Sequence, residues 1–384
     1  METLYNAAVA YTEGLHEELI ALIKTLCRIP APSNLEEQRA AFCKKWFEAA
    51  GAKAVHVDSA LNAIVSMNDT GSNDLIVFMA HTDTVFPDLE PFEAAEDGDR
   101  LCCPGVGDDT ANLAMLMLCV RHFIQTGIPE GTGVLFVANA GEEGLGNLKG
   151  CRQLMKDYAG RVKQVISFDG GLGHVVNKAV GSDRYQVKIT AQGGHSYGKF
   201  GNTNAIHLLS CMVADLYAIT PPVAQGGGSK TTYNVGLISG GTSVNTIAQT
   251  AEMLYEYRSD DQGCLDQMRA HFNTIVEKYK ALAVAVDIEL LGARPCMGDV
   301  DPAIQKALEG RIVAAIEKEA GIPSVAFGSG STDCNIPYSM GIPGICTGGY
   351  TGEGAHRREE WISLSSLHPG IRAVMGMVAG EIYR

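Results

Sequence analysis

Acidic and imidazole side chains follow several short apolar runs of this 384-residue chain. The runs and the residues after them are LIVFMA (75–80) with His81, GVLFVANA (133–140) with Glu142 and Glu143, and QVISF (164–168) with Asp169. After IPGICT (342–347) comes a glycine-rich turn that ends at His356. A further acid, Asp108, lies in the glycine-rich segment PGVGDDTAN. Zinc accepts both nitrogen and oxygen ligands, so two histidines and three of these carboxylates suit a zinc site.

The five expected ligands serve two ions if Asp108 is shared between them. His81, Asp108 and Asp169 would then hold one ion, and Asp108, Glu143 and His356 would hold the other. Each ion would have three protein ligands and an open position, as a catalytic zinc site requires. Two ions about 3.5–4 Å apart can generate a nucleophile and polarise a substrate carbonyl. The expected cofactor is therefore two Zn²⁺ per chain, which Co²⁺ or Mn²⁺ could replace.

Two acids beside these ligands are expected to have other roles. Asp83 is two residues after His81, and side chains at this spacing point the same way in extended backbone. Asp83 is therefore expected to orient the imidazole of His81. Adjacent residues of an extended chain face opposite ways, so Glu142 and Glu143 are not expected to bind the same ion. Glu142 would then be the general base that takes a proton from water and passes it to the leaving amine.

Each segment taken alone has a simpler explanation. Asp108 and Asp109 could cap a helix, Asp169 could be a turn residue before two glycines, and Gly-Glu-Glu-Gly could be a solvated turn. Their joint occurrence after strand-like runs favours the metal site. The chain has no Gly-x-Ser-x-Gly elbow and no Walker-type lysine loop, which argues against a serine hydrolase and an NTP hydrolase.

Strand-like and helical patterns alternate around these residues. Helical patterns at 109–126 and 147–158 lie between the apolar runs, which predicts an α/β fold with a mostly parallel sheet flanked by helices. In such a sheet, ligands bind outside the carboxyl ends of the strands. The N-terminal stretch METLYNAAVAYTEGLHEELIALI has the pattern of one amphipathic helix.

The pattern changes near residue 182. Four strand-like stretches, DRYQVKITAQGG, TTYNVGLISGG, TAEMLYEYRSD and AVAVDIELL, alternate with helical patterns at 203–219 and 262–283. They predict an inserted α+β domain at 182–292, which interrupts a catalytic domain formed by 1–181 and 293–384.

The composition restricts the partners and the compartment. The formal net charge is −14, which argues against a nucleic-acid partner, and no apolar stretch is long enough to span a membrane. Eleven cysteines, an odd number without a C-x-x-C pair, favour a reducing cytoplasm.

The ordered set of motifs resembles the zinc metallopeptidase family that includes peptidase T, carboxypeptidase G, aminoacylase and succinyl-diaminopimelate desuccinylase. The motifs are MAHTDTV, GVGDDTANLA, NAGEEGLG, SFDGG, TAQGGHSYG, NVGLISGGTSVNTIA, EYRSD, FGSGSTDCNIP and GEGAHRREEW. They run from about residue 75 to 360. The pair Asp108-Asp109 and the FDGG stretch are most similar to the peptidase T branch. The resemblance implies the same five ligands, with Glu142 as base and Asp83 behind His81.

The resemblance also implies roles that spacing alone does not show. The insert would act as a lid or dimerisation domain of a homodimer. His195 would reach the partner subunit's active site and stabilise the oxyanion, Asn245 and Arg258 would hold the substrate, and Gly348 would lie near it. The function expected is a di-zinc exopeptidase of short peptides. An N-acyl-amino-acid amidohydrolase of the deacetylase or desuccinylase type is the alternative, and a catalytically silent binding protein is a third possibility.

Overall fold

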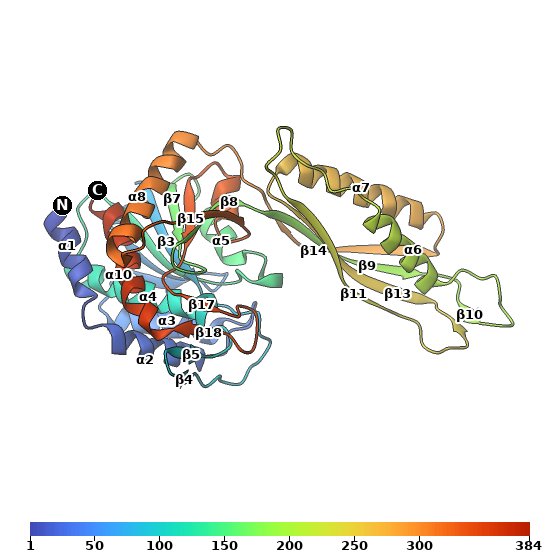
Figure 1. The fold of residues 1–384 in the computed structure, drawn as a ribbon, viewed down its shortest axis with the longest axis horizontal. Coiled ribbons are helices and arrows are strands. Elements are labelled where there is room, and N and C mark those ends of the chain that lie inside the picture. Colours follow the sequence, from blue (N-terminus) through green and yellow to red (C-terminus); the bar gives the residue numbers. More distant parts are fainter. The chain divides into compact units, whose positions relative to one another are not determined.

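The computed structural model describes residues 1–384 and divides them into two units. Unit 1 contains Met1–Ala179 and Gly298–Arg384, and unit 2 contains Val180–Met297 (Figure 1). Unit 2 is thus one uninterrupted segment inserted into unit 1, and the predicted boundaries at 182 and 292 lie within it.

An eight-stranded sheet forms the centre of unit 1. The strand order is β1-β2-β6-β3-β7-β16-β8-β15. The strands are β1 (Val55–Val57), β2 (Ala63–Met67), β6 (Gly133–Asn139), β3 (Leu75–His81), β7 (Val162–Ser167), β16 (Gly344–Thr347), β8 (His174–Ala179) and β15 (Ala326–Gly330). The central strands β6, β3, β7 and β16 are mutually parallel, so their carboxyl ends meet at one edge. The mostly parallel sheet predicted from the apolar runs is confirmed.

Helices bury this sheet on both faces, as parallel sheets require. Phe78, Phe136 and Ile166 belong to the same core as residues from the longer helices. Those helices are α2 (His16–Cys27), α3 (Glu37–Ala49), α4 (Asn112–Thr126), α8 (Pro302–Ala320) and α10 (Leu367–Ile382), with α1 (Glu2–Tyr11) against α10. Side chains that alternate with these, such as Val77 and Met79, are also fully buried. Two shorter helices, α5 (Lys149–Asp157) and α9 (Asn335–Ser339), contact each other.

The N-terminal stretch is not one helix, as its pattern predicted, but two. Helix α1 ends at Tyr11 and α2 begins at His16. Gly14 between them has a φ of +80°, a backbone conformation that cannot continue a right-handed helix and that glycine adopts without steric cost.

A small antiparallel sheet lies beside the carboxyl edge of the central sheet. It joins β4 (Ala95–Asp97) and β5 (Arg100–Cys102) to β17 (Gly352–Glu353) and β18 (Trp361–Ser363). Its pairing brings the segment before Asp108 next to the loop that carries His356, although some 250 residues separate them.

Unit 2 is a four-stranded antiparallel sheet with two helices on one face (Figure 1). The order is β11 (Thr231–Gly240), β13 (Thr250–Ser259), β9 (Gly181–Thr190) and β14 (Ala285–Arg294). Helices α6 (Ala205–Tyr217) and α7 (Gln262–Lys280) pack on alternate strand residues such as Val187, Met253 and Tyr255. Short strands β10 (Gly194–His195) and β12 (Thr246–Ile247) pair at one end. In neither unit is there a helix long and apolar enough to cross a bilayer.

A buried arginine fixes the backbone directly after His81. The guanidinium of Arg39, 3% exposed, donates hydrogen bonds to the carbonyls of Thr82 (2.9 Å), Leu26 (2.8 Å) and Ile29 (2.8 Å). It therefore joins the end of β3 to the end of α2 and the residues that follow it.

We expect Arg39→Met to destabilise unit 1 by about 3 kcal/mol, because it removes the guanidinium donor from the carbonyls of Thr82 and Ile29. Urea unfolding followed by tryptophan fluorescence reports on this unit, since both tryptophans, Trp46 and Trp361, belong to it. Lys45→Ala, an exposed change on the same helix, is the control and should shift the transition by less than about 0.5 kcal/mol. Equal stabilities of the two variants would contradict the role of Arg39.

Candidate metal centre

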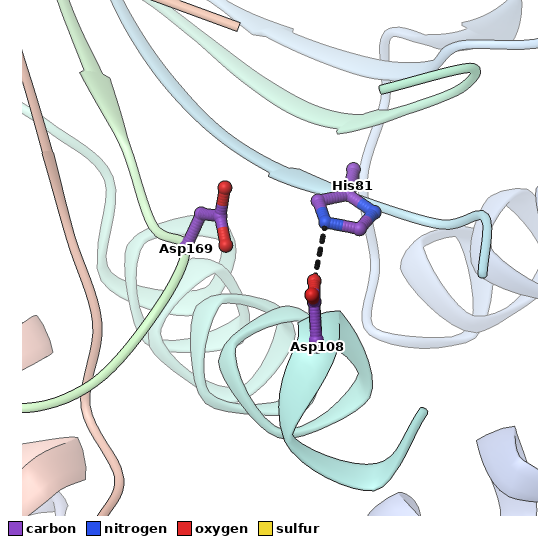
Figure 2. Close-up of side chains that lie close together, drawn as sticks. All are labelled: His81, Asp108 and Asp169. Carbon is purple, nitrogen blue, oxygen red and sulfur yellow. Dashed lines mark hydrogen bonds and ion pairs between the residues drawn. The ribbon is translucent and has the colours of Figure 1, made fainter. Parts of the chain in front are cut away.

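Three parallel strands deliver acids and an imidazole to one edge of the sheet. His81 is the last residue of β3, Glu142 and Glu143 follow β6, and Asp169 follows β7. Asp108 reaches the same place from the turn that precedes α4. Figure 2 shows the side chains of His81, Asp108 and Asp169 pointing toward one another from three different elements.

The side chains form two groups that could each hold an ion. One group is His81, Asp108 and Asp169, and the other is Asp108, Glu143 and His356; within each, one ligand atom per residue lies within 4.8 Å of the others. Asp108 is common to both. Its Oδ1 lies 3.1 Å from Nε2 of His81, while its Oδ2 lies 3.0 Å from Nε2 of His356. The two oxygens of one carboxylate therefore face two different histidines, the arrangement of a bridging ligand.

Glu142 and Glu143 do not point in opposite directions, as alternation along an extended chain predicted. A third group, His81, Glu142 and Glu143, also places one ligand atom of each residue within 4.8 Å of the others. The reason is that β6 ends at Asn139, and Gly141 follows with a φ of +69°. Both acids lie beyond the end of the strand, where its alternation does not apply.

Asp83 is buried behind these residues and accepts hydrogen bonds from several of them. Its Oδ1 accepts from the backbone N–H of Glu142 (3.0 Å), and its Oδ2 accepts from that of Glu143 (2.9 Å) and from Oγ of Ser33 (2.7 Å). Nδ1 of His81 lies 3.5 Å from Oδ1 and 3.0 Å from the Asp83 carbonyl. The carboxylate thus positions His81 with Nε2 toward Asp108, and it holds the turn that carries both glutamates.

The turn that carries Asp108 is held by Glu360, which the sequence did not single out. The Glu360 carboxylate accepts hydrogen bonds from the backbone N–H groups of Gly105 (2.7 Å), Gly107 (2.9 Å) and Asp108 (2.9 Å). Gly105 has a φ of +71°, and a Cβ there would lie 2.6 Å from Cγ2 of Thr84, so this position requires glycine. The partners are 252 to 255 residues apart, so no local pattern indicates this contact.

A second buried network supports the Asp169 side of the centre. Asn112 donates to Asp109 (2.7 Å) and to the Gly170 carbonyl (3.1 Å), and its Oδ1 accepts from the Gly349 N–H (2.8 Å). Asp109 in turn accepts from the backbone N–H of His81 (3.0 Å), so it does not cap the helix. A Cβ on Gly348 would lie 1.6 Å from the Gly170 carbonyl oxygen, so only glycine fits there.

The carboxylates at this centre repel one another. Burial, with Asp108 and Glu142 nearby, raises the pKa of Glu143 to about 7, although its hydrogen bond with His356 opposes the shift. Burial and Asp108 raise the pKa of Asp169 to about 6. Hydrogen bonds to Asp108 and Glu143 raise the pKa of His356 to about 10. Positive charge is therefore favoured among these side chains.

The donor set fits divalent cations. Three carboxylates and two imidazoles form the two groups, and within each group the ligand atoms are close enough together to bind one ion. Zinc accepts both types of donor. The centre is thus a possible metal site, formed entirely within unit 1.

The other residues expected at the site are divided between the units. Gly348 lies in unit 1, whereas His195, Asn245 and Arg258 lie in unit 2. His195 is exposed in β10, where its Nδ1 accepts from the N–H groups of Tyr197 (3.3 Å) and Gly198 (3.2 Å). The Asn245 carbonyl accepts from the Ser196 N–H (3.0 Å), so Asn245 lies beside the His195 loop. Arg258 lies on β13.

The sequence matches a known protein family. Residues 77–379 match the model of peptidase family M20/M25/M40. Succinyl-diaminopimelate desuccinylase of Bordetella parapertussis is 25% identical over 311 residues, which is 77% of this chain and 80% of that protein.

Solved structures have the same fold over nearly the whole chain. A tripeptidase from Staphylococcus aureus superposes with a TM-score of 0.74 at 21% identity, over 95% of this chain and 99% of its own. Aminopeptidase PepT from Bacillus cereus gives a TM-score of 0.70 at 21% identity, over 96% and 99%. A dinuclear metal-binding M20 peptidase from Bacillus subtilis gives 0.66 at 16% identity, over 97% and 99%.

The family match covers well over half of the chain, and it confirms the resemblance that the ordered motifs indicated. The protein therefore belongs to peptidase family M20/M25/M40 and is a hydrolase.

Proposed function

We propose that this hydrolase is a di-zinc exopeptidase that cleaves amide bonds of short peptides. The observation that carries the proposal is the position of Asp108, whose two carboxylate oxygens face His81 and His356 at 3.1 and 3.0 Å. A carboxylate shared in this way supports two neighbouring ions rather than one.

Five residues would hold the ions. His81, Asp108 and Asp169 would bind one, and Asp108, Glu143 and His356 would bind the other. When bound, a zinc pair supplies a Lewis acid for the substrate carbonyl and favours deprotonation of water near neutral pH. Co²⁺ or Mn²⁺ could take the place of Zn²⁺ at such a donor set.

Glu142 is the proposed general base. Its side chain is buried, and its backbone N–H is held by Asp83, so the carboxylate is presented at a fixed position beside His81 and Glu143. From there it takes a proton from the attacking water and delivers it to the leaving amine. Behind it lies Asp333, a fully buried acid bonded to Asn139, and burial and Glu142 together raise the pKa of Asp333.

Four further residues are proposed to act on the substrate. Arg258 would hold a substrate carboxylate, because its planar guanidinium is permanently charged and can bind a carboxylate through two hydrogen bonds. Asn245 would contact the substrate, and Gly348 would present backbone to it. His195 would stabilise the oxyanion from the partner subunit, and its exposure within unit 2 is compatible with that role.

We further propose that unit 2 mediates a homodimer. Strand β11 is an edge strand, and it exposes Leu237 and Ile238. Exposed apolar edge strands favour pairing with another chain.

All eleven cysteines are free thiols in the structure, which supports a reducing cytoplasm as the compartment.

Two substrate classes fit the same metal centre, and the relatives support both. The similar structures are named aminopeptidase and tripeptidase, whereas the similar sequence is named a desuccinylase. An N-acyl-amino-acid amidohydrolase is therefore the second candidate.

A substrate panel distinguishes the two candidates. We expect the zinc-loaded protein to release amino acids from di- or tripeptides, with slower turnover of N-acetyl and N-succinyl amino acids. Free amine released over time is the measurement. Cleavage of acyl amino acids alone would replace the first candidate by the second.

Glu142→Gln should lower kcat by about 10²–10⁴-fold, because the amide cannot take up the proton, and it should leave the metal content unchanged. Steady-state kinetics and elemental analysis of the same sample give both quantities. Glu130→Gln, an exposed glutamate of unit 1, is the matched control and should keep full activity. Retained turnover in Glu142→Gln would place the base elsewhere.

Asp108→Ala should remove both ions, because each is expected to depend on the shared carboxylate. His356→Ala should remove only one, since His81, Asp108 and Asp169 remain. Metal content per chain after dialysis is the measurement. One ion retained by Asp108→Ala would exclude a bridging role for this residue.

A further inference from the structure

The two histidines of the metal centre are supported in different ways. His81 is the last residue of β3, its side chain is 1% exposed, and Arg39 fixes the backbone that follows it. His356 lies in the loop between β17 and β18, and its side chain is 57% exposed. The core therefore holds His81, whereas the position of His356 depends on how its loop is held.

The loop that carries His356 has few contacts of its own to hold it. Residues 355–359 are all exposed, so burial of apolar side chains does not fix them. His356 has a φ of +65°, a left-handed conformation that raises the free energy of a residue with a side chain. Pairing of β17 with β18 holds only the two ends of the loop. Contacts with another part of unit 1 therefore decide how firmly the loop stays in place.

Arg358 supplies such contacts two residues after His356. Its Nη1 donates to Oδ1 of Asp88 (3.1 Å) and its Nη2 donates to Oδ2 (2.7 Å). Two parallel bonds of this kind fix the orientation of the guanidinium as well as its distance. The guanidinium carbon also lies 5.3 Å from the ring centre of Phe86 and 5.6 Å from that of Phe92, within the range of a cation–π interaction.

The partners of this arginine belong to a firmly held segment, residues 84–92. Phe86 is 6% exposed and meets Phe92 edge to face, with ring centres 6.0 Å apart. Phe92 in turn packs against the core of unit 1. The segment begins directly after Asp83, the carboxylate that positions the opposite side of the metal centre. Arg358 thus joins an exposed loop to a supported part of the same centre.

We propose that Arg358 is a positioning residue that, through its contact with Asp88 and the two phenylalanines, holds His356 at the metal centre. It thereby sets the affinity for the ion bound by Asp108, Glu143 and His356, and in this respect the inference rests on the proposed function. The apparent affinity for a ligand falls with the fraction of molecules in the binding-competent conformation. A loop that opens more often would bind this ion more weakly, although every ligand is still present.

Metal titration tests the proposal. Arg358→Gln should weaken binding of one ion by about 5- to 10-fold, because the two-bond contact and the ring contacts are both lost. It should leave the affinity for the other ion unchanged, because His81, Asp108 and Asp169 lie outside the loop. Titration of the metal-free chain with Zn²⁺ against a chromophoric chelator gives both affinities. Unchanged affinity for both ions, or equal weakening of both, would overturn the proposal.

Matched variants separate this role from a general loss of charge. Arg28→Gln removes another exposed arginine–carboxylate contact, with Glu93 directly after the same segment, and it should leave both affinities unchanged. Arg358→Lys retains the charge without the planar fork, and it should keep part of the affinity. An equal loss in Arg28→Gln would contradict the assignment.

The pair with Asp88 has its own test. Asp88→Asn should weaken binding of the same ion, and the double variant with Arg358→Gln should bind it no more weakly than Arg358→Gln alone, because both changes remove one contact. Additive losses would show that the two residues act separately and would overturn the pairing.

Hydrogen exchange in the metal-free chain separates failure of this inference from failure of the proposed function. The N–H groups of Arg357 and Glu360 donate to the carbonyls of Gly354 (2.9 Å) and Arg357 (3.2 Å), so their exchange reports on opening of the loop. Both should exchange about 5-fold faster in Arg358→Gln than in the wild type, as measured by residue-resolved mass spectrometry.

If the wild-type chain binds no ion, the proposed function fails, and the exchange rates still test the contact. Unchanged exchange of the loop in Arg358→Gln, or equal acceleration throughout unit 1, overturns the inference whatever ions the chain binds.

Discussion

The geometry of the metal centre depends on one buried carboxylate, that of Asp83. It accepts from the backbone of both glutamates after β6 and from Ser33, and it lies against Nδ1 of His81. A buried charge is tolerated only when hydrogen bonds satisfy it, and here the groups that satisfy it are those the chemistry needs in place. Burial opposes ionisation, yet the bonds from His81 and Ser33 keep the pKa of Asp83 below its usual range.

Buried hydrogen bonds also position the rest of the metal centre. Glu360 accepts from three N–H groups of the turn that carries Asp108, and Asn112 joins that turn to the segments after β7 and β16. Side chains that touch no expected ion therefore position those that do.

Much of the sheet and of the metal centre could be predicted from the sequence, because the patterns that indicate them are local. Runs such as LIVFMA specify buried strands, and parallel strands bring their carboxyl ends together, so His81, Glu143 and Asp169 were expected at one edge. Glu360 and Ser33 could not be found, because their partners are distant in sequence and only the tertiary fold brings them close. The relative orientation of Glu142 and Glu143 was predicted wrongly, because alternation was extended past the last residue of β6.

The insertion of unit 2 has a consequence for biosynthesis. Strand β16 lies in the interior of the large sheet, between β7 and β8, yet it begins at residue 344. Ribosomes extend the chain from the N-terminus, so the contiguous residues 180–297 are complete while that sheet still lacks an inner strand. Until residue 344 has been synthesised, β7 and β8 therefore lack the strand that joins them, and their facing edges stay unpaired.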